Sequence, residues 1–170
     1  MNFAQCFAQL VDGQHEGGAL STDRNDRGNW TGGQVGLGLF KGSKFGISAA
    51  QYPNEDIANL TPERAKELYL RDYWGPAGCD ALPDGLHFDM FDMAANSGPR
   101  NALKTLQRAV GEAVDGVLGP RTLQAVQSMP VARVVSRFNG ARLMFLTDAP
   151  GWVYEGRGWA RRIAANLLQA

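Results

Sequence analysis

Two carboxylates and a hydroxyl lie in a glycine-rich segment near the start of the chain. Glu16 stands between His15 and a pair of glycines, and Asp26 and Thr31 follow within about fifteen residues. Cleavage of a glycosidic bond needs an acid that stays protonated near neutral pH and a second group that handles the incoming water. This segment can supply both kinds of group.

The position of Glu16 favours the role of the acid. Apolar residues recur every three or four positions from Phe3 to Val11, which predicts a first helix capped by Asn2 and ended by the glycines that follow. A carboxylate at the C-terminal end of a helix faces the negative end of the helix dipole, which disfavours its ionised form. Apolar neighbours would raise its pKa further. The alternative is a solvated glutamate at a helix end.

Asp26 and Thr31 have a structural alternative of their own. In a glycine-rich loop, Asp and Thr usually form turns by accepting hydrogen bonds from their own backbone. Asp23 competes with Asp26 as the second carboxylate, whereas the amide of Asn25 cannot serve as a base. The sequence does not fix the distance between Glu16 and Asp26.

Aromatic and polar side chains elsewhere are candidates for binding a sugar. Trp30 and Tyr52 can stack on sugar rings, while Tyr73 and Trp74 are better explained as core residues. Asp92 and Asn96 lie four positions apart, which places them on one face of a predicted helix. They line a polar groove or cap the break at Gly98-Pro99.

Other kinds of chemistry find little support. His15, His87, Asp89 and Cys79 can be imagined as zinc ligands, but no His-Glu-x-x-His motif or paired cysteines occur. No Gly-x-Ser-x-Gly motif indicates a serine nucleophile. We therefore expect no metal and no cofactor. With one other cysteine, Cys6, the chain favours two buried, reduced thiols over a disulfide.

Composition narrows the class of protein. The 170 residues are 44% hydrophobic and 20% charged with a net charge of zero, as in one soluble globular domain without a nucleic-acid motif. No window approaches the ~20 apolar residues of a membrane span. The N-terminal residues lack the basic start and unbroken apolar run of a secretory signal. We therefore expect a protein made in the cytoplasm, monomeric by default, with no membrane insertion.

The pattern along the chain predicts an α+β fold that is mostly α. A helix is followed by a small, glycine-rich β-lobe with turns and an irregular hairpin. In this lobe, large apolar residues alternate with other residues over 34–40. About six helices follow, and no linker separates the parts. Their expected positions are residues 61–74, 87–97, around 103–110, from 120, from 131, and 153–168. The segment from Asp115 to Thr122 is typical of a turn that leads into a helix.

Together these motifs resemble glycoside hydrolase family 108, the N-acetylmuramidases found as phage endolysins and related bacterial proteins. The matching pieces are Glu16-Gly17-Gly18, Asn25-Asp26-Arg27-Gly28, Thr31, Phe45-Gly46-Ile47-Ser48, Tyr73-Trp74, Cys79-Asp80 and Asn96-Ser97-Gly98-Pro99. Residues 106–122 resemble the predicted peptidoglycan-binding region of this family. One departure is that the usual Asp-Pro-Gly-Gly becomes Asp26-Arg27-Gly28-Asn29, with one residue added between Glu16 and Asp26.

The resemblance implies a lysozyme-like fold, with residues 1–170 as a single domain. Residues 1–95 would form the catalytic lobe and residues 96–170 a helical, peptidoglycan-binding-like region. Glu16 matches the catalytic glutamate of the family, and Asp26 and Thr31 match its downstream Asp and Thr. Trp30, Tyr52 and Asn96 remain candidates for binding the substrate.

The expected reaction is hydrolysis of the β-1,4 bond from N-acetylmuramic acid to N-acetylglucosamine in the glycan strands of peptidoglycan. The alternatives are a lytic transglycosylase, a non-catalytic wall-binding module and, more remotely, a zinc amidase. Without a signal, we expect the protein to accumulate in the host cytoplasm until a holin or another release system opens the membrane. Both a phage endolysin and a bacterial effector fit this description.

Overall fold

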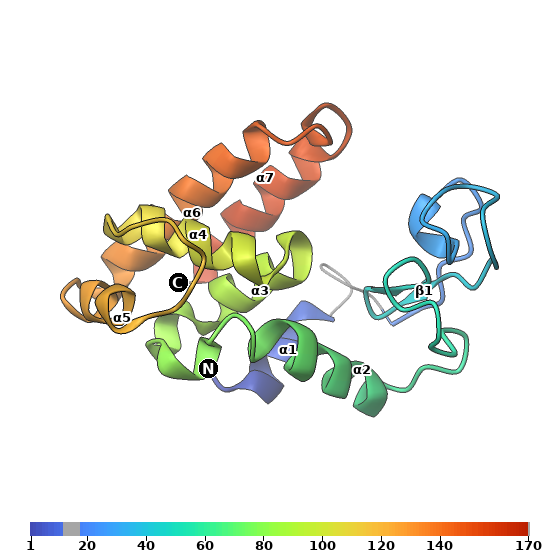
Figure 1. The fold of residues 1–170 in the computed structure, drawn as a ribbon, viewed down its shortest axis with the longest axis horizontal. Coiled ribbons are helices and arrows are strands. Elements are labelled where there is room, and N and C mark those ends of the chain that lie inside the picture. The colour runs from blue at the N-terminus through green and yellow to red at the C-terminus, as the bar shows by residue number, and fades with distance from the viewer. Residues whose placement is uncertain (12–17, 170) are drawn as a thin grey trace. The chain divides into compact units, whose positions relative to one another are not determined.

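The computed structural model describes residues 1–11 and 18–169 (Figure 1). In these residues the fold is α+β and mostly helical, as predicted, with seven α-helices and one two-stranded sheet. The helices are α1 (Phe3–Leu10), α2 (Pro62–Tyr69), α3 (His87–Ser97), α4 (Pro99–Val110), α5 (Pro120–Gln127), α6 (Val131–Thr147) and α7 (Trp152–Gln169). The strands are β1 (Ser43–Lys44) and β2 (Ile47–Ser48).

The chain divides into two compact units. One comprises Met1–Cys6 and Tyr69–Ala170, called here the helical unit, and the other comprises Phe7–Leu68, called here the hairpin unit. The expected organisation as one domain with lobes 1–95 and 96–170 stays a prediction.

Side chains at the helix ends explain where the helices begin. Asn2 Oδ1 accepts a hydrogen bond from the backbone N of Gln5 at 3.0 Å, and Gln5 Oε1 accepts one from the N of Asn2 at 2.9 Å. This reciprocal pair is a capping box for α1. Thr61 Oγ1 accepts from the N of Arg64 at 3.2 Å and so caps α2, which confirms Thr61 as the N-cap.

Most of the later helices lie where they were predicted, although α4 begins at Pro99, before the expected residues 103–110. A π-helix, η2 (Leu70–Trp74), continues α2 to Trp74, as predicted. Gly98, with φ +88°, separates α3 from α4, whose first residue is Pro99. Because Pro lacks a backbone N–H and has a fixed φ, it suits a first helical position. Pro120 begins α5 in the same way.

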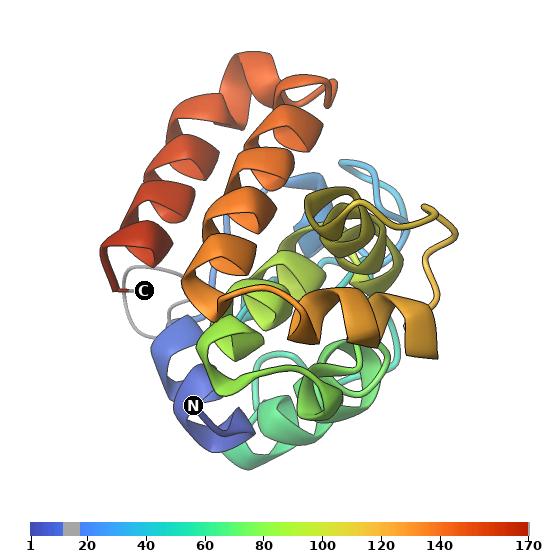
Figure 2. The same ribbon diagram turned by 90° about the vertical axis from the view of Figure 1, so that its left-hand side faces the viewer.

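The helical unit is built on apolar burial. Residues 87–94 of α3 are all buried. Tyr73 and Trp74 are buried too, which confirms them as core residues. Edge-to-face contacts join Phe3 to Trp74 and Phe91, at centroid distances of 5.3 and 5.8 Å. The helices α6 and α7 lie side by side (Figure 2).

A buried carboxylate ties three helices of this unit together. Asp92 on α3 is fully buried and lies 2.6 Å from Arg142 on α6 and 2.6 Å from Arg162 on α7. Asn166 Nδ2 donates to it at 2.9 Å. Burial alone would raise the pKa of Asp92, but the two guanidinium groups outweigh burial and hold its pKa at about 2. Both expectations for Asp92, a polar groove or a cap, are therefore wrong.

The turn before α5 is held by a side chain from α4. Gln107 is buried, and its Oε1 accepts from the N of Gly116 at 2.8 Å while its Nε2 donates to Asp115 Oδ1 at 2.7 Å. Asp115 Oδ1 also accepts from the N of Val117 at 2.8 Å. The predicted turn is thereby confirmed.

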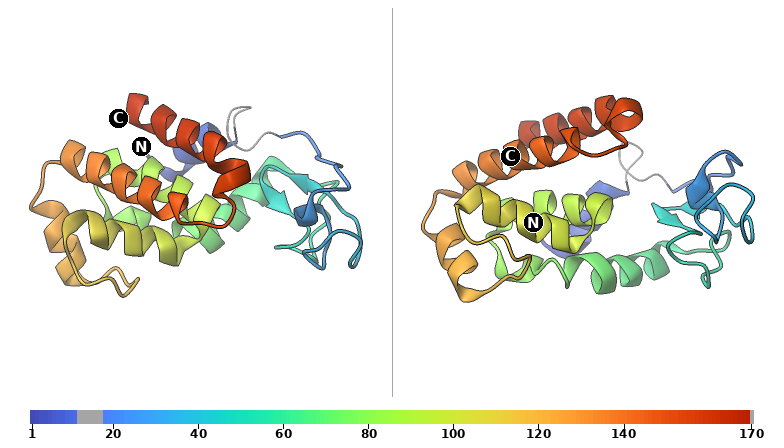
Figure 3. Two further views of the ribbon diagram at one scale, coloured as in Figure 1. Left: turned by 90° about the horizontal axis from the view of Figure 1, so that it is seen from above. Right: turned by 45° about the horizontal axis from the view of Figure 1, so that its top comes forward.

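The hairpin unit contains the two strands (Figure 3). Lys44 pairs with Ile47, and the two residues between them, Phe45 and Gly46, both have positive φ, at 53° and 74°. Positive φ at both central residues is typical of a type I′ hairpin turn. The alternating residues 34–40 form turns instead of strands, because Gly36 and Gly38 adopt φ +80°.

Both cysteines lie in the helical unit as buried, free thiols, as predicted. Burial raises the pKa of Cys6 to about 11 and that of Cys79 still further. Their thiols are therefore protonated at neutral pH.

None of the helices in the described part of the chain combines the length and the apolar character needed to cross a bilayer.

Candidate active site

Asp26 is exposed and anchored at one oxygen. It caps a short 3-10 helix, η1 (Arg27–Asn29), and its Oδ1 accepts from the backbone N of Gly28 at 2.8 Å. A Cβ added to Gly28 would lie 3.1 Å from Asp26 Oδ1, so glycine suits this close approach. Among residues 1–11 and 18–169, Oδ2 of Asp26 has no hydrogen-bond partner. The carboxylate is thus fixed in direction and open to solvent.

Thr31 has a structural bond of the kind expected of a turn former. Its Oγ1 accepts from the N of Leu39 at 2.8 Å, and its backbone N donates to Leu39 O at 2.9 Å. Gly38 passes so close that an added Cβ would lie 2.3 Å from Thr31 Oγ1. The hydroxyl proton is not used in this bond, so it can still be donated to a water or a sugar oxygen.

A residue that sequence reasoning missed holds this turn in place. Asn29 is fully buried, and its Nδ2 donates to Asp23 O at 2.9 Å. Its backbone O accepts from the N of Lys41 at 3.0 Å and from the N of Gly42 at 3.2 Å. Asn29 therefore joins the turn that carries Asp26 to the start of the hairpin. An asparagine in a glycine-rich loop gives no signal of burial.

Asp23, the competing carboxylate, has a similar local role to Asp26. Its Oδ1 accepts from the N of Asn25 at 2.9 Å, and its side chain is exposed. Each aspartate thus stabilises a turn of its own. Their hydrogen bonds do not distinguish which of the two is the better candidate for the catalytic base.

The hairpin contacts two other segments that resemble the family, the Asp26 turn and Gly18. The N of Ala50 donates to Gly28 O at 2.9 Å, and a Cβ on Gly28 would lie 3.7 Å from the Cβ of Ser48. At the hairpin turn, a Cβ on Gly18 would lie 2.7 Å from a ring carbon of Phe45. The hairpin therefore contacts both the Asp26 turn and Gly18, which stands two residues after Glu16.

Phe45, which contacts Gly18, has a strained backbone. A positive φ in a residue other than glycine costs on the order of 1 kcal/mol, and Phe45 has φ +53°. Lys44 Nζ lies 5.4 Å from the centroid of its ring. His15 and Glu16 themselves lie outside the described residues, so the structure does not place the predicted acid.

The predicted sugar-binding residues do not all belong to one unit. The ring of Trp30 packs 5.1 Å from that of Phe40, and its Nε1 donates to Arg24 O at 3.0 Å. Tyr52 is half-buried, and its backbone N donates to Ser48 O at 2.9 Å. Trp30 and Tyr52 lie in the hairpin unit with Asp26 and Thr31.

Asn96 lies in the helical unit, near the end of α3. Its Oδ1 accepts from Ser97 Oγ at 2.9 Å. The catalytic roles of Glu16, Asp26 and Thr31 and the binding roles of Trp30, Tyr52 and Asn96 stay predictions.

Across the described ranges, no group of three or more His, Cys, Asp and Glu side chains is arranged to hold a metal ion. His87 is buried, and its two ring nitrogens face Met1 O at 2.5 Å and Leu82 O at 2.8 Å. These contacts give His87 a packing role in the helical unit.

Comparison with known families decides the class of protein. The family described as Glycosyl hydrolase 108 matches residues 12–98, more than half of the chain. The chain belongs to glycoside hydrolase family 108. The matched range contains Glu16, Asp26 and Thr31, so the resemblance based on motifs is confirmed for this part. Residues 99–170 lie outside the family match, and the peptidoglycan-binding region expected there stays a prediction.

A solved structure extends the similarity in fold to nearly the whole chain. The structure of Brucella abortus SagA is 27% identical and gives a TM-score of 0.78, over 98% of this chain and 92% of that chain. No functionally curated protein matches this family 108 chain. The lysozyme-like α+β fold is thus confirmed.

Proposed function

We propose that this family 108 chain hydrolyses the β-1,4 bond from N-acetylmuramic acid to N-acetylglucosamine in peptidoglycan. Glu16 donates its proton to the glycosidic oxygen, which leaves as a sugar hydroxyl. A water oxygen attacks the anomeric carbon, and the water proton passes to Asp26. Thr31 helps to orient that water through its hydroxyl.

The observation that carries this proposal is the family match over residues 12–98, which contain Glu16, Asp26 and Thr31. The geometry of Asp26 also suits a base. One oxygen is fixed by Gly28 N at 2.8 Å, and the carboxylate is exposed. A general base works best when its direction is set by the scaffold and its second oxygen can reach water. The anchored Asp26 and the half-buried Thr31 meet these needs in the same unit.

The decisive experiment is mass spectrometry of sacculi digested with the purified chain. Hydrolysis gives fragments with reducing N-acetylmuramic acid ends, each heavier by one water than an anhydro product. Anhydromuramic ends would instead assign a lytic transglycosylase. Sedimentation with sacculi without release of soluble fragments would assign a binding module, and free peptides lost on chelation would assign an amidase.

Variants assign the roles of the two acids. Glu16→Gln and Asp26→Asn should each lower the rate of release by about 10²–10⁴-fold, the contribution typical of acid–base groups. The side-chain amide introduced by Asp26→Asn keeps an oxygen that can accept from Gly28 N, so the turn is preserved. Asp23→Asn is the matched control, because Asp23 also caps a turn, at 2.9 Å from Asn25 N. Full activity of Glu16→Gln would overturn the proposal.

The biological setting is part of the same proposal. The protein acts on the wall after a holin or another system opens the inner membrane, and it works as a monomer. Expression alone should leave cells intact, whereas added chloroform should cause prompt lysis. Prompt lysis without a permeabilising agent would contradict this release step.

A further inference from the structure

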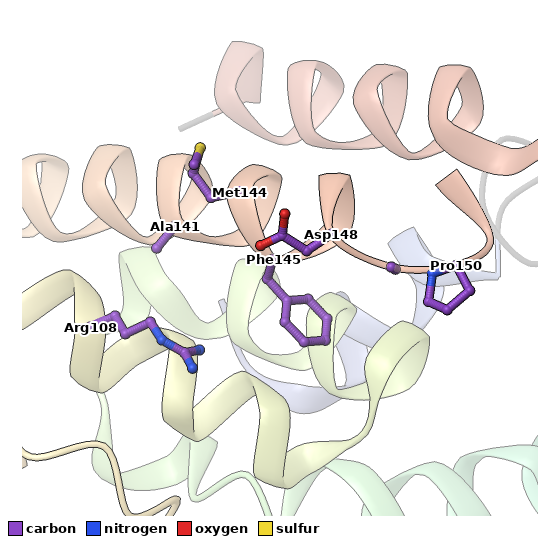
Figure 4. Close-up of a pocket in the computed structure, with 7 residues that line it drawn as sticks. Arg108, Ala141, Met144, Phe145, Asp148 and Pro150 are labelled. Carbon is purple, nitrogen blue, oxygen red and sulfur yellow. The ribbon is translucent and has the colours of Figure 1, made fainter. Parts of the chain in front are cut away.

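A pocket of about 590 Å³ opens in the helical unit, beside α4 and the C-terminal end of α6 (Figure 4). This volume lies within the range of small-molecule sites. It is lined by Arg108, Ala141, Met144, Phe145, Asp148, Ala149 and Pro150. All of these residues follow the range matched by the family and lie in the region 96–170 that was expected to resemble a peptidoglycan-binding region.

Two opposite charges on this pocket are unused by the fold. Arg108 on α4 and Asp148 at the end of α6 are both exposed. In residues 1–11 and 18–169, neither side chain has an ion-pair or hydrogen-bond partner, and the two do not pair with each other. In the same unit, Arg142 and Arg162 are paired with Asp92. The pocket thus offers a cation and an anion to a ligand.

The rest of the pocket lining is apolar. Met144 is 66% exposed, and the ring of Phe145 extends from α6 toward α4 (Figure 4). Exposed apolar surface next to placed charges is typical of a binding site. Asp148 also stands at the C-terminal end of α6, where the helix dipole adds negative potential and favours an ammonium group.

We propose that this pocket binds the stem peptide of peptidoglycan. A stem peptide has free carboxylates, a diamino acid whose side chain can carry a free ammonium, and alanine methyl groups. A carboxylate would bind Arg108, the ammonium would bind Asp148, and the aliphatic part would cover Met144 and Phe145. An uncharged glycan would leave both charges unused. This inference rests on the proposed function, since it places part of the same substrate.

Binding is tested with the full chain, because a probe without sugar has no glycosidic bond to be cleaved. The probe is a sugar-free tetrapeptide of alanine, γ-linked glutamate, diaminopimelate and alanine, followed by calorimetry and by NMR shifts. We expect saturable binding that weakens about tenfold or more with Arg108→Glu or Asp148→Lys, because each removes a charge-assisted hydrogen bond. Arg108→Lys should retain most of the affinity.

Controls separate the pocket from the general charge of the unit. Arg133 is exposed, lies on α6 and does not line the pocket. Arg133→Glu should therefore leave the affinity unchanged. Acetylation of the diamino acid's side chain should weaken binding to the parent chain, but should have no effect in Asp148→Lys. A tetrapeptide that fails to bind, or that binds equally to both pocket variants, would overturn the inference.

Activity assays distinguish this inference from the proposed function. With Glu16 present, Arg108→Glu should raise KM on intact sacculi and leave kcat unchanged. The same variant should match the parent on glycan strands stripped of peptide by an amidase. Equal KM on both substrates would contradict the pocket alone. Peptide binding without any glycan cleavage would contradict the proposed function alone.

Discussion

Residues 18–56 of the hairpin unit and the residues of the helical unit are held by different interactions. Between residues 18 and 56, the described buried apolar side chains are those of Ile47 and Ala49. That segment is organised by backbone hydrogen bonds, by Asp and Asn side chains in turns, and by glycines with positive φ. In the helical unit, α3 alone buries eight consecutive residues. Side chains in residues 18–56 are therefore oriented by hydrogen bonds with the backbone, and those of the helical unit by packing.

This difference suits the roles proposed for the two units. A loop that must present Asp26 and Thr31 to a sugar cannot bury them in an apolar core. Hydrogen bonds to the backbone fix their direction instead. Buried apolar contacts, which depend less on exact direction, give the helical unit its stability.

The largest predicted effect concerns the buried charge of the helical unit. Asp92→Asn removes the carboxylate that pairs with the buried Arg142 and with Arg162. Breaking a buried ion pair costs roughly 3–5 kcal/mol. Urea unfolding should show this loss of stability. Hydrogen exchange should show faster exchange of backbone amides in residues 69–169. Arg121→Gln is the control, because its partner Glu112 lies 3.5 Å away and Arg121 is 85% exposed. It should change stability by less than about 1 kcal/mol.

The next effect concerns the hairpin unit and rests on two matched glycines. Gly36 and Gly38 both have φ +80°, but a Cβ on Gly38 would lie 2.3 Å from Thr31 Oγ1, whereas nothing lies within 4 Å at Gly36. Gly36→Ala should cost only about 1 kcal/mol of backbone strain. Gly38→Ala adds overpacking of about 1–3 kcal/mol. If Thr31 acts on water, Gly38→Ala should also lower activity at least tenfold. Equal activity of the two variants would contradict a role for this loop.

Acid provides a third test, which acts on the helical unit. The pKa of Asp92 in the folded chain is about 2, below its ordinary value of 3.8. A lowered pKa gives stability above pH 4 that is lost as pH falls toward 2, by about 2 kcal/mol in all. The nearby Asp89 acts oppositely, because burial raises its pKa. Urea midpoints at pH 7, 4 and 2.5 should therefore fall more in the parent than in Asp92→Asn. Parallel curves would show that Asp92 is not the titrating group.

Much of the fold could be predicted from the sequence, for reasons that differ between the units. Each predicted helix carries its own start and stop signals, such as Thr61-Pro62 and Gly98-Pro99, and apolar spacing decides its buried face. The predicted hairpin falls in the right segment, but its strands lie at 43–48, because positive φ at Gly36 and Gly38 is not visible in alternation alone.

The candidate site is harder to predict because its contacts are long-range. Residue type and spacing are enough to single out Asp26 and Thr31. They do not reveal Asn29, because its burial depends on a bond to Asp23 and on bonds from residues 41–42, which only the fold brings close. They also misplace Asp92 in a groove or a cap, because its partners, Arg142 and Arg162, lie 50 and 70 residues away.

The last test uses the two cysteines as probes of the helical unit. Both thiols are buried in the helical unit, and burial raises the pKa of Cys6 to about 11. Only a thiolate attacks a disulfide reagent, so a native chain at pH 8 should leave both thiols unlabelled. Labelling then reports opening of the helical unit. Asp92→Asn should speed it by roughly 10²–10⁴-fold, as expected for a loss of about 3–5 kcal/mol. Gly38→Ala should leave the labelling rate unchanged, because this substitution destabilises the hairpin unit. Equal acceleration by both variants would mean that the two units open together.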